Sequence, residues 1–254
     1  MNGKEENSKI AAIIQARLGS TRLPGKILKE VSGMPILWHV VNRLSYSKLI
    51  DEIIIATTDL AEDDRVQDFC ERNNILFYRG SSEDVLSRYY ETASKFEAGA
   101  IIRITSDCPV IDPVIIDRML EYYLKENLSG SMDYLNNVMP RTFPRGLDTE
   151  IFSFRALALA HHDAKQFYER EHVTPYIYNH PEIFTLKSFT SEKDHSAYRW
   201  TVDTQEDFLL IEKIYTSLYK KNNLFLLPDI LKLFEEQPQL IKINQSVKQK
   251  NLGE

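Results

Sequence analysis

Short apolar runs alternate with amphipathic stretches through the first half of the chain. Four runs have the length and the continuous hydrophobicity of strands that are covered on both faces. They are residues 9–15 (KIAAIIQ), 52–57 (EIIIAT), 75–78 and 100–105 (AIIRIT). Helical patterns follow them, at residues 34–46, 62–73, 83–96 and 113–126. This alternation predicts βαβ units on a parallel sheet, and therefore an α/β fold.

Residues with short polar side chains mark the starts of these helices. Ser82 is predicted to cap the third helix, and Asp112 followed by Pro113 opens the fourth. The second helix is expected to open on a solvated acidic turn, favourable to the helix macrodipole, formed by Glu62, Asp63 and Asp64.

The regular alternation weakens after residue 129. Residues 130–144 read as an irregular segment, and strands are predicted at 147–152, 183–189 and 199–202. Helices are predicted at 154–162 after the cap Ser153, at 167–179, at 228–236, and after Thr204, where Asp207 completes a near capping box. We predict one domain over residues 1–243, with a small inserted subdomain at 130–195 and a flexible polar tail at 244–254.

Composition and charge exclude several classes of protein. Hydrophobic residues make up 43% and charged residues 27% of the 254, which is ordinary for a globular chain. The net charge of −6 predicts no broad footprint for nucleic acid. No apolar run approaches the roughly 18 residues of a membrane helix, and none before Arg17 reads as a signal peptide. Cys70 and Cys108 lack metal-type spacing. Because the sequence shows no secretory signal, we expect a cytoplasmic protein without membrane insertion, in which a disulfide is not needed.

The segment directly after the first strand, residues 15–27 (QARLGSTRLPGKI), carries the most chemistry. In open α/β sheets, ligands bind outside the carboxyl ends of the strands. Small residues let backbone amides approach an anion closely here, namely Gly19, Ser20 and Gly25. Three cations lie within ten residues, namely Arg17, Arg22 and Lys26. The loop therefore suits a polyphosphate, and the alternative is a surface loop whose basic residues serve solubility.

Two well-known phosphate loops do not match this segment. The Walker A pattern encloses four residues between its glycines, whereas Gly19 and Gly25 enclose five, and Ile27 stands in place of the hydroxyl that holds magnesium. The Rossmann pattern G-x-G-x-x-G is absent from the sequence. Neither a P-loop ATPase nor a dinucleotide-binding protein is predicted.

The stretch IIQARLGSTRLPGKIL closely resembles the first motif of the cytidylyltransferases that make CMP-activated sugars, such as CMP-Kdo and CMP-sialic acid synthetases. The resemblance spans roughly residues 8–210 and is closest to the spore coat polysaccharide biosynthesis protein F branch. It implies a Rossmann-like nucleotidyltransferase fold of glycosyltransferase-A type, a three-layer sandwich with a mostly parallel sheet. It also implies CTP and Mg²⁺ as reactants, a homodimer, and a role in surface polysaccharide synthesis. The nucleotide-binding residues that it implies in this segment are Gln15, Ala16, Arg17, Gly19, Ser20, Arg22 and Lys26.

Two aspartates stand just past predicted strands, on the side where this loop is expected. Asp107 lies in RITSDCPVIDP and Asp203 in YRWTVDTQEDF. Magnesium prefers one or two carboxylates together with phosphate oxygens and waters. The resemblance assigns the metal to these two positions, although Gln205 replaces the more usual proline. From the residues alone, a turn before Pro109 and a helix cap before Thr204 are the alternatives.

A third segment resembles the part of the family that lies beside the cytosine. It is residues 80–89 (GSSEDVLSRY), which makes Ser82, Asp84 and Arg88 candidates for the base. A helix cap at Ser82, with Asp84 in the first turn, is the simpler alternative. Arg103 lies inside an apolar strand, where an unpaired charge is costly, so we expect it to face phosphate, base or a carboxylate, and we count it among the nucleotide-binding candidates.

Two further segments, residues 140–150 (PRTFPRGLDTE) and 169–175 (EREHVTP), resemble branch-specific stretches and are interpreted as walls of an acceptor site. The predicted acceptor-binding residues are Arg141, Arg145, Asp148, Glu150 and His172. The two arginines suit a carboxylate or a phosphate on the sugar, because guanidinium matches either anion in bidentate fashion. For His172, a ligand or base of the acceptor and a plain helix-surface histidine both stay open.

Together these segments predict a CTP-dependent sugar cytidylyltransferase. A hydroxyl or phosphate of an acidic or phosphorylated sugar would attack the α-phosphorus of CTP, and pyrophosphate would leave. The predicted catalytic residues are Arg22, Lys26, Asp107 and Asp203. A glycosyltransferase that shares the fold is one alternative, but the sequence lacks the D-x-D triplet that such enzymes often use. A non-catalytic nucleotide-binding protein is the other.

Overall fold

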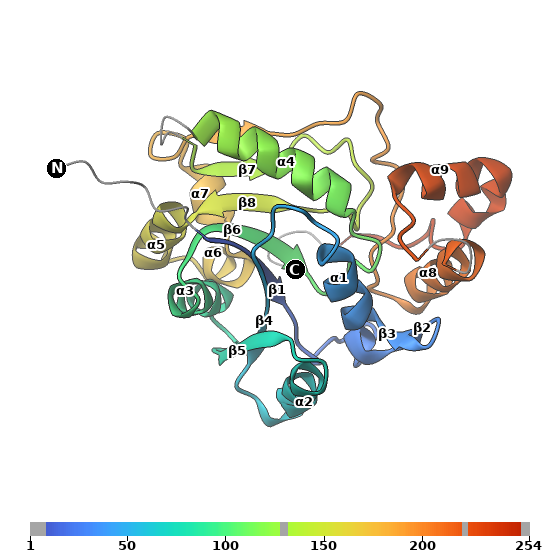
Figure 1. Cartoon of the computed structure of the whole chain (residues 1–254), viewed down its shortest axis with the longest axis horizontal. Helices are drawn as coiled ribbons and strands as arrows, with labels where there is room; N and C mark the ends of the chain where they lie inside the picture. The colour runs from blue at the N-terminus through green and yellow to red at the C-terminus, as the bar shows by residue number, and fades with distance from the viewer. Residues whose placement is uncertain (1–8, 128–131, 220–222, 250–254) are drawn as a thin grey trace.

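The centre of the protein is one seven-stranded sheet in the order β5-β4-β1-β6-β8-β7-β9 (Figure 1). The computed structural model describes residues 9–127, 132–219 and 223–249. Four parallel strands form the first part of the sheet: β1 (Lys9–Gln15), β4 (Glu52–Thr58), β5 (Leu76–Gly80) and β6 (Ala98–Thr105). The sheet then continues antiparallel through β8 (Glu150–Ser153) to β7 (Tyr134–Asn136), which pairs in parallel with β9 (Leu186–Ser188).

Helices cover both faces of this sheet (Figure 1). One face carries α1 (Ile36–Leu44), α2 (Asp64–Arg72), α4 (Pro113–Glu126), α8 (Gln205–Leu218) and α9 (Leu227–Glu236). The other face carries α3 (Val85–Lys95), α5 (Phe154–Asp163), α6 (Phe167–His172) and α7 (Pro175–Asn179). Short 3₁₀ turns are η1 (Lys26–Leu28), η2 (Ala61–Asp63) and η4 (Pro238–Lys242), and β2 (Glu30–Val31) pairs with β3 (Met34–Pro35) as a separate hairpin.

The central strand β1 shows why the sheet is buried on both sides. Ile10, Ala12 and Ile14 pack in the core under α1, α2 and α4, whereas Ala11 and Ile13 pack in the core under α3 and α5. Successive side chains of a strand point to opposite faces, so a continuous apolar run is what a strand between two helical layers requires. The predicted three-layer α/β sandwich with a mostly parallel sheet is confirmed.

Most of the helix starts are also confirmed. Asp112 accepts hydrogen bonds from the backbone N–H groups of Val114 and Ile115, and Ser153 accepts one from Ala156. Thr204 and Asp207 form the predicted capping box of α8.

Two of the local predictions in the first half are wrong. The cap of α3 is Asp84, which accepts from the backbone N–H of Ser87 at 2.9 Å, and not Ser82. Met34 and Pro35 form β3 ahead of α1 rather than the first helical turn, because their backbone pairs with β2.

The predicted subdomain at 130–195 contributes β7, β8 and β9 to the main sheet, which continues from β6 into them. The single helix predicted at 167–179 is two helices, since Val173 has a φ of 73° and interrupts them. The strand predicted at 199–202 is only one bridge, between Arg199 and Arg145. Residues 128–131 lie outside the described residues, so the irregular segment predicted from 130 is described from 132 onward.

Two side chains of the predicted flexible tail, Asn244 and Gln249, form hydrogen bonds with the rest of the protein. Asn244 is buried, and its amide donates to the backbone oxygen of Arg199 at 2.9 Å and to Asp207 Oδ1 at 2.8 Å. Gln249 Oε1 accepts from Arg199 Nη1 at 2.6 Å. Residues 250–254 of that predicted tail lie outside the described residues.

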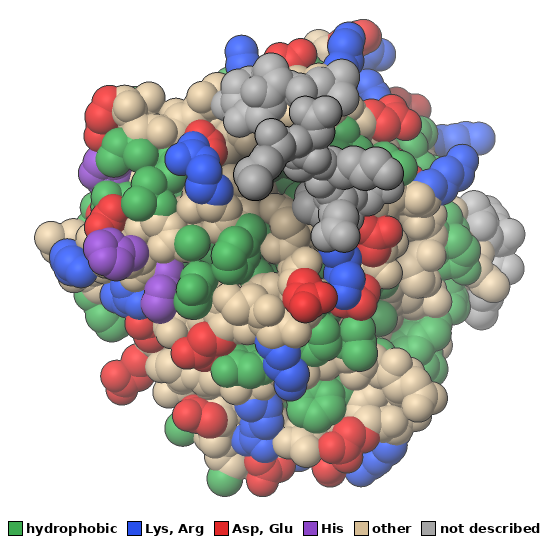
Figure 2. All heavy atoms as spheres, turned by 60° about the vertical axis from the view of Figure 1, so that its left-hand side comes forward, with side chains coloured by type: hydrophobic (Ala, Val, Ile, Leu, Met, Phe, Trp, Pro, Cys, Tyr) green, Lys and Arg blue, Asp and Glu red, His purple; other side chains and the backbone are tan. Residues whose placement is uncertain are grey.

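The surface carries charges of both signs. On the face shown in Figure 2, Lys and Arg side chains are interspersed with Asp and Glu rather than gathered into one stripe. In the described part of the chain, no helix is both long enough and apolar enough to span a membrane.

Gly146 lies where the backbone leaves no room for a side chain. Its φ is 103°, and an added Cβ would lie 2.6 Å from the carbonyl carbon of Trp200. We expect Gly146→Ala to lower the free energy of unfolding by more than about 1 kcal/mol, because the positive φ is unfavourable for alanine and the added methyl group would clash with the backbone of Trp200. Urea unfolding measures this loss. Gly33→Ala is the control, since Gly33 also has a positive φ but nothing lies within 4 Å of its added Cβ; equal losses would contradict the account.

Candidate active site

The loops that follow β1 and β6 flank the point where the connections of the sheet diverge. From β1 the chain continues to β4 on one side, and from β5 it returns to β6 on the other side of β1. Open α/β sheets bind ligands at such a switch point, outside the carboxyl ends of the strands. Residues 16–25 and 106–112 lie there, so the loop singled out in the sequence and the segment with Asp107 come together.

The first of these loops is held by a buried carboxylate. Asp63 Oδ1 accepts from the backbone N–H of Leu18 at 2.7 Å, and Asp63 Oδ2 accepts from the hydroxyl of Thr58. The Asp63 side chain is fully buried, so the prediction of a solvated acidic turn is wrong for Asp63, whereas Glu62 and Asp64 are exposed. An Asp at the start of a helix looks the same in the sequence whether it faces water or a neighbouring loop, so no local pattern reveals this role.

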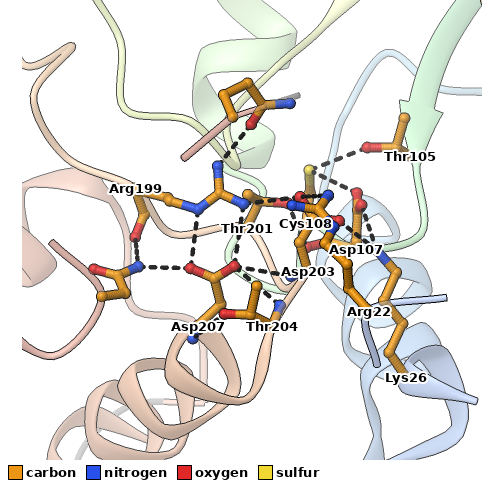
Figure 3. Close-up of polar contacts among 12 residues, drawn as sticks. Arg22, Lys26, Thr105, Asp107, Cys108, Arg199, Thr201, Asp203, Thr204 and Asp207 are labelled. Atoms are coloured by element: carbon orange, nitrogen blue, oxygen red, sulfur yellow. Dashed lines mark hydrogen bonds and ion pairs between the residues drawn. The ribbon is translucent and has the colours of Figure 1, made fainter. Parts of the chain in front are cut away.

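Lys26 lies between the two predicted metal ligands (Figure 3). Its Nζ donates to Asp107 Oδ2 and to Asp203 Oδ1, at 2.8 Å in each case. Arg22 Nη2 lies 3.0 Å from the other oxygen of Asp203. Three segments that are far apart in the sequence thus meet in one charged cluster, which we call the Lys26 cluster: Arg22, Lys26, Asp107 and Asp203.

A buried arginine, which the sequence analysis missed, stands behind this cluster (Figure 3). Arg199 Nη2 donates to Asp203 Oδ2 at 2.8 Å, and its Nε donates to Asp207 Oδ1 at 2.9 Å. Burial alone would lower the pKa of Arg199, but Asp207 and Asp203 outweigh burial and raise it. The guanidinium therefore stays charged and fixes the orientation of Asp203. The only sequence signal was the spacing of two carboxylates four and eight residues after an arginine.

The charges of the cluster shift the pKa of Lys26 and the pKa of Asp107. Burial favours the neutral form of Lys26, but Asp107 and Asp203 outweigh burial, so the pKa of Lys26 is raised. Burial would likewise raise the pKa of Asp107, but its charge and hydrogen-bond contacts with Lys26 lower it to about 2. Lys26 and Asp107 are therefore both ionised at neutral pH, which suits binding of phosphate and of a divalent cation.

The lowered pKa of Asp107 predicts how stability depends on acid. Its folded pKa lies below the ordinary value of 3.8, so ionised Asp107 stabilises the fold above that pH and loses this contribution as the pH falls toward about 2. We expect the wild type to exceed Asp107→Asn in free energy of unfolding by a margin that shrinks between about pH 5 and about pH 2. Urea unfolding at each pH measures the margin, and a constant margin would contradict the assignment.

A first cavity, of about 390 Å³, opens over the Lys26 cluster. Nine of the residues predicted to bind the nucleotide or the metal line this cavity: Gln15, Ala16, Arg17, Gly19, Ser20, Arg22, Lys26, Asp107 and Asp203. Arg88, considered for the base, also lines it. Six residues without an earlier assignment to this site complete the walls: Thr21, Val85, Thr105, Ser106, Glu171 and His172, the last predicted for the acceptor. Two buried wall atoms, Gln15 Oε1 and Arg88 Nε, have no hydrogen-bond partner among the described residues, so they are available to a ligand.

A second cavity, of about 580 Å³, adjoins the first. All five predicted acceptor residues line it: Arg141, Arg145, Asp148, Glu150 and His172. Its other walls are Arg103, Thr105, Val138, Met139, Thr174, Tyr178 and Gln249. The two cavities share Thr105 and His172. Tyr178 and Gln249 were missed because only the packing of α7 and of residues 244–249 brings them to this wall.

The charged residues of the second cavity differ in whether they are paired. Arg141 donates to both oxygens of Asp148, at 2.6 and 2.8 Å, and Arg103 donates to Glu150. Arg145 has no side-chain hydrogen bond or ion pair within the described ranges, and both burial and Arg141 lower its pKa. The second cavity thus presents one guanidinium that forms no ion pair with a carboxylate among the described residues.

Three of the residues predicted for the nucleotide are placed elsewhere. Ser82 and Asp84 line neither cavity, and Asp84 instead caps α3 and lies 2.7 Å from Arg170. Arg103 lines the second cavity, not the first, because its partner Glu150 lies on the neighbouring strand β8. Of the alternatives weighed for Arg103, the carboxylate partner is the one present.

Residues 11–243 match the model of the cytidylyltransferase family. This match spans most of the chain, so the protein belongs to the cytidylyltransferases and is a nucleotidyltransferase. The resemblance stated from the sequence is confirmed.

Relatives of known name agree with this class. The chain is 33% identical over 213 residues to the spore coat polysaccharide biosynthesis protein SpsF of Bacillus subtilis, covering 81% of this chain and 86% of that one. A solved cytidylyltransferase from Leptospira borgpetersenii superposes with a TM-score of 0.88 at 33% identity, over 96% of this chain and 100% of that one. A solved CMP:2-keto-3-deoxy-manno-octonic acid synthetase shares the fold, with a TM-score of 0.63 at 18% identity over 83% and 99% of the two chains.

Proposed function

We propose that this protein is a CTP-dependent cytidylyltransferase that activates an acidic or phosphorylated sugar for surface polysaccharide synthesis. The observation that carries the proposal is the meeting of two cavities beside the Lys26 cluster. One cavity is lined by the cationic loop after β1, and the other by the arginine-rich residues 141–150. An oxygen of the sugar attacks the α-phosphorus of CTP where the cavities join, and pyrophosphate leaves.

The loop after β1 supplies the contacts for the triphosphate. Arg17, Arg22 and Lys26 place three cations around the first cavity, and Gly19 with Ser20 presents the backbone closely. These charges stabilise the pyrophosphate as it departs, and no covalent protein nucleophile is needed. The orphaned Gln15 Oε1 and Arg88 Nε supply one acceptor and one donor, and the edge of a cytosine base offers partners for both.

The donor set fits a magnesium ion. Asp107 and Asp203 each place an oxygen 2.8 Å from a single ammonium group, so the two carboxylates converge on a position already occupied by a cation. Two carboxylates are what Mg²⁺ uses alongside phosphate oxygens and waters. Asp107 and Asp203 would hold the ion, which supplies neutralisation of the triphosphate charge and polarisation of the α-phosphate when bound.

The second cavity supports the choice of an acidic acceptor. Arg145 is the guanidinium that lacks a carboxylate partner there, and Arg141 offers a second one held by Asp148. A carboxylate or phosphate on the sugar would neutralise Arg145. The B. subtilis relative, named for spore coat polysaccharide biosynthesis, supports a sugar of a surface polymer. A homodimer and a cytoplasmic location stay predictions.

Pyrophosphate release tests the proposal. The protein with Mg²⁺ is given CTP, UTP, ATP or GTP, each with ulosonic acids, sugar phosphates or polyol phosphates. Release with CTP and an acidic acceptor is the expected result. Release of free nucleotide from a nucleotide sugar would favour a glycosyltransferase, and CTP binding without turnover over the whole panel would favour the non-catalytic alternative.

A further inference from the structure

His172 stands at the junction of the two cavities. Among the described residues, only His172 and Thr105 line both of them. In the proposed reaction the sugar oxygen must meet the α-phosphorus at this junction, so a group that touches both cavities can reach the reacting atoms. Building on that proposed function, we propose that His172 is the general base that removes the proton from an attacking sugar hydroxyl.

Both carboxylates of the second cavity are already engaged. Asp148 is held by both nitrogens of Arg141. Glu150 accepts from Arg103, from the hydroxyl of Tyr134 and from the hydroxyl of Thr174. A carboxylate that is ion-paired and hydrogen-bonded is a poor base, because its negative charge is already stabilised. Tyr178 is unsuitable as well, since burial raises its pKa and keeps the phenol protonated.

The imidazole of His172, by contrast, has both nitrogens available. The nearest carboxylate, that of Glu171, lies 3.8 Å from Nε2, beyond hydrogen-bond distance. No hydrogen bond to the ring occurs in the described part of the chain. Burial lowers the pKa of His172 below its ordinary value of 6.5; of the charged groups that face it, Glu171 on α6 and Glu150 on β8 oppose this, and Arg103 on β6 adds to it. The ring is therefore neutral at pH 7 and able to accept a proton.

The backbone beyond His172 fixes its place at the junction. Val173 is fully buried at a φ of 73°, a conformation that costs a β-branched residue free energy. The backbone N–H of Thr174 donates to the carbonyl oxygen of His172 at 2.9 Å, and the Thr174 side chain donates to Glu150 at 2.7 Å. Strain of this kind persists only where the surroundings enforce it, and it tends to occur at functional sites. Here the conformation of Val173 ends α6 at His172 and turns the chain past Glu150.

The step has a definite proton balance. The O–H bond of the sugar breaks and its proton moves to a ring nitrogen of His172, while the sugar oxygen forms a bond to the α-phosphorus. The bond from the α-phosphorus to the bridging oxygen breaks, and pyrophosphate leaves with the electron pair. The imidazolium then returns its proton to water. An ionised phosphate acceptor has no proton to give, so this assignment selects a hydroxyl acceptor over a sugar phosphate.

The test compares His172→Gln with the wild type. Pyrophosphate release is measured with Mg²⁺ and CTP over a panel of non-phosphorylated ulosonic acids and a panel of sugar phosphates, between pH 5 and 9. We expect release with a hydroxyl acceptor, and a loss of about 10²-fold or more in kcat at neutral pH in the variant. The acid limb of the wild-type pH profile should disappear in the variant, and the affinity for CTP should fall far less than kcat. Imidazole should partly restore activity to His172→Ala.

The matched control is His162→Gln, since His162 lies exposed on α5 and lines neither cavity; we expect it to behave as wild type. Turnover with sugar phosphates alone, or an unchanged pH profile in His172→Gln, would overturn the assignment of His172. No pyrophosphate from the wild type with any acceptor would instead overturn the proposed function.

A second measurement does not depend on the acceptor. The chain has six histidines. The NMR resonance of His172 is assigned as the histidine signal that is missing from the spectrum of His172→Gln. We expect this ring to titrate below pH 6.5 and to shift when CTP and Mg²⁺ are added. A ring that stays protonated at pH 7.5 in the CTP-bound protein would overturn the proposal, whatever the acceptor panel gives.

Discussion

Replacing Asp107 by asparagine is expected to lower kcat by about 10²-fold or more. Asp107 contributes one of the two carboxylates that converge on the cation position, and it is one of the two acceptors of Lys26. The amide removes the negative charge but keeps the shape of the side chain, so the loss measures electrostatics rather than packing. The measurement is the initial rate of pyrophosphate release at saturating CTP and Mg²⁺.

The control for this variant is Asp68→Asn, which removes an exposed carboxylate of α2 whose one ion-pair partner among the described residues is Arg72, across one helical turn. We expect it to keep the wild-type rate, because an exposed pair of this kind contributes little. A near-normal rate in Asp107→Asn would remove Asp107 from the proposed metal site.

Lys26→Met is expected to raise the KM for CTP and to lower kcat/KM by about 10²-fold or more. The variant removes the cation that both carboxylates share, which is also one of the three cations of the loop after β1. It should stay folded, because Arg22 and Arg199 still neutralise Asp203. In the absence of CTP it should bind Mn²⁺ more tightly than the wild type, since Lys26 no longer competes for the carboxylates.

Steady-state kinetics and Mn²⁺ titration followed by electron paramagnetic resonance measure these two effects. Lys29→Met is the control: Lys29 lies three residues further on, stacks over the ring of Phe208 and lines neither cavity. Unfolding of Lys26→Met at room temperature would make Lys26 a structural residue. Weaker Mn²⁺ binding would show that Lys26 supports the metal position instead of competing for it.

The part of the fold that sequence predicts well is the part built from local signals. The run at residues 9–15 predicts β1 at its observed bounds, because a strand between two helical layers must be apolar on both faces. Asp112 and the pair Thr204 and Asp207 predict helix starts, because a cap satisfies backbone N–H groups within three residues of itself. The loop after β1 is found for the same reason, since its cations and glycines are neighbours in the sequence.

Contacts between distant segments account for what the sequence does not predict. Asp63 reads as a solvated residue because its partner, the backbone of Leu18, lies 45 positions away. Arg103 is assigned to the nucleotide because the sequence does not show that Glu150, on an antiparallel neighbour, lies beside it. Asn244 and Gln249 read as a flexible tail because their partner Arg199 is itself part of a site assembled from several segments.

The central claim, transfer of a cytidylyl group at the Lys26 cluster, is tested most directly by following the phosphorus atoms of CTP. The protein is incubated with Mg²⁺, an acidic sugar acceptor and CTP labelled with ³²P at either the α or the γ position. We predict that the α label appears in the sugar product and the γ label in pyrophosphate, and that both signals are lost in Asp107→Asn. Transfer of the γ label to the sugar, or its release as orthophosphate alone, would contradict the account.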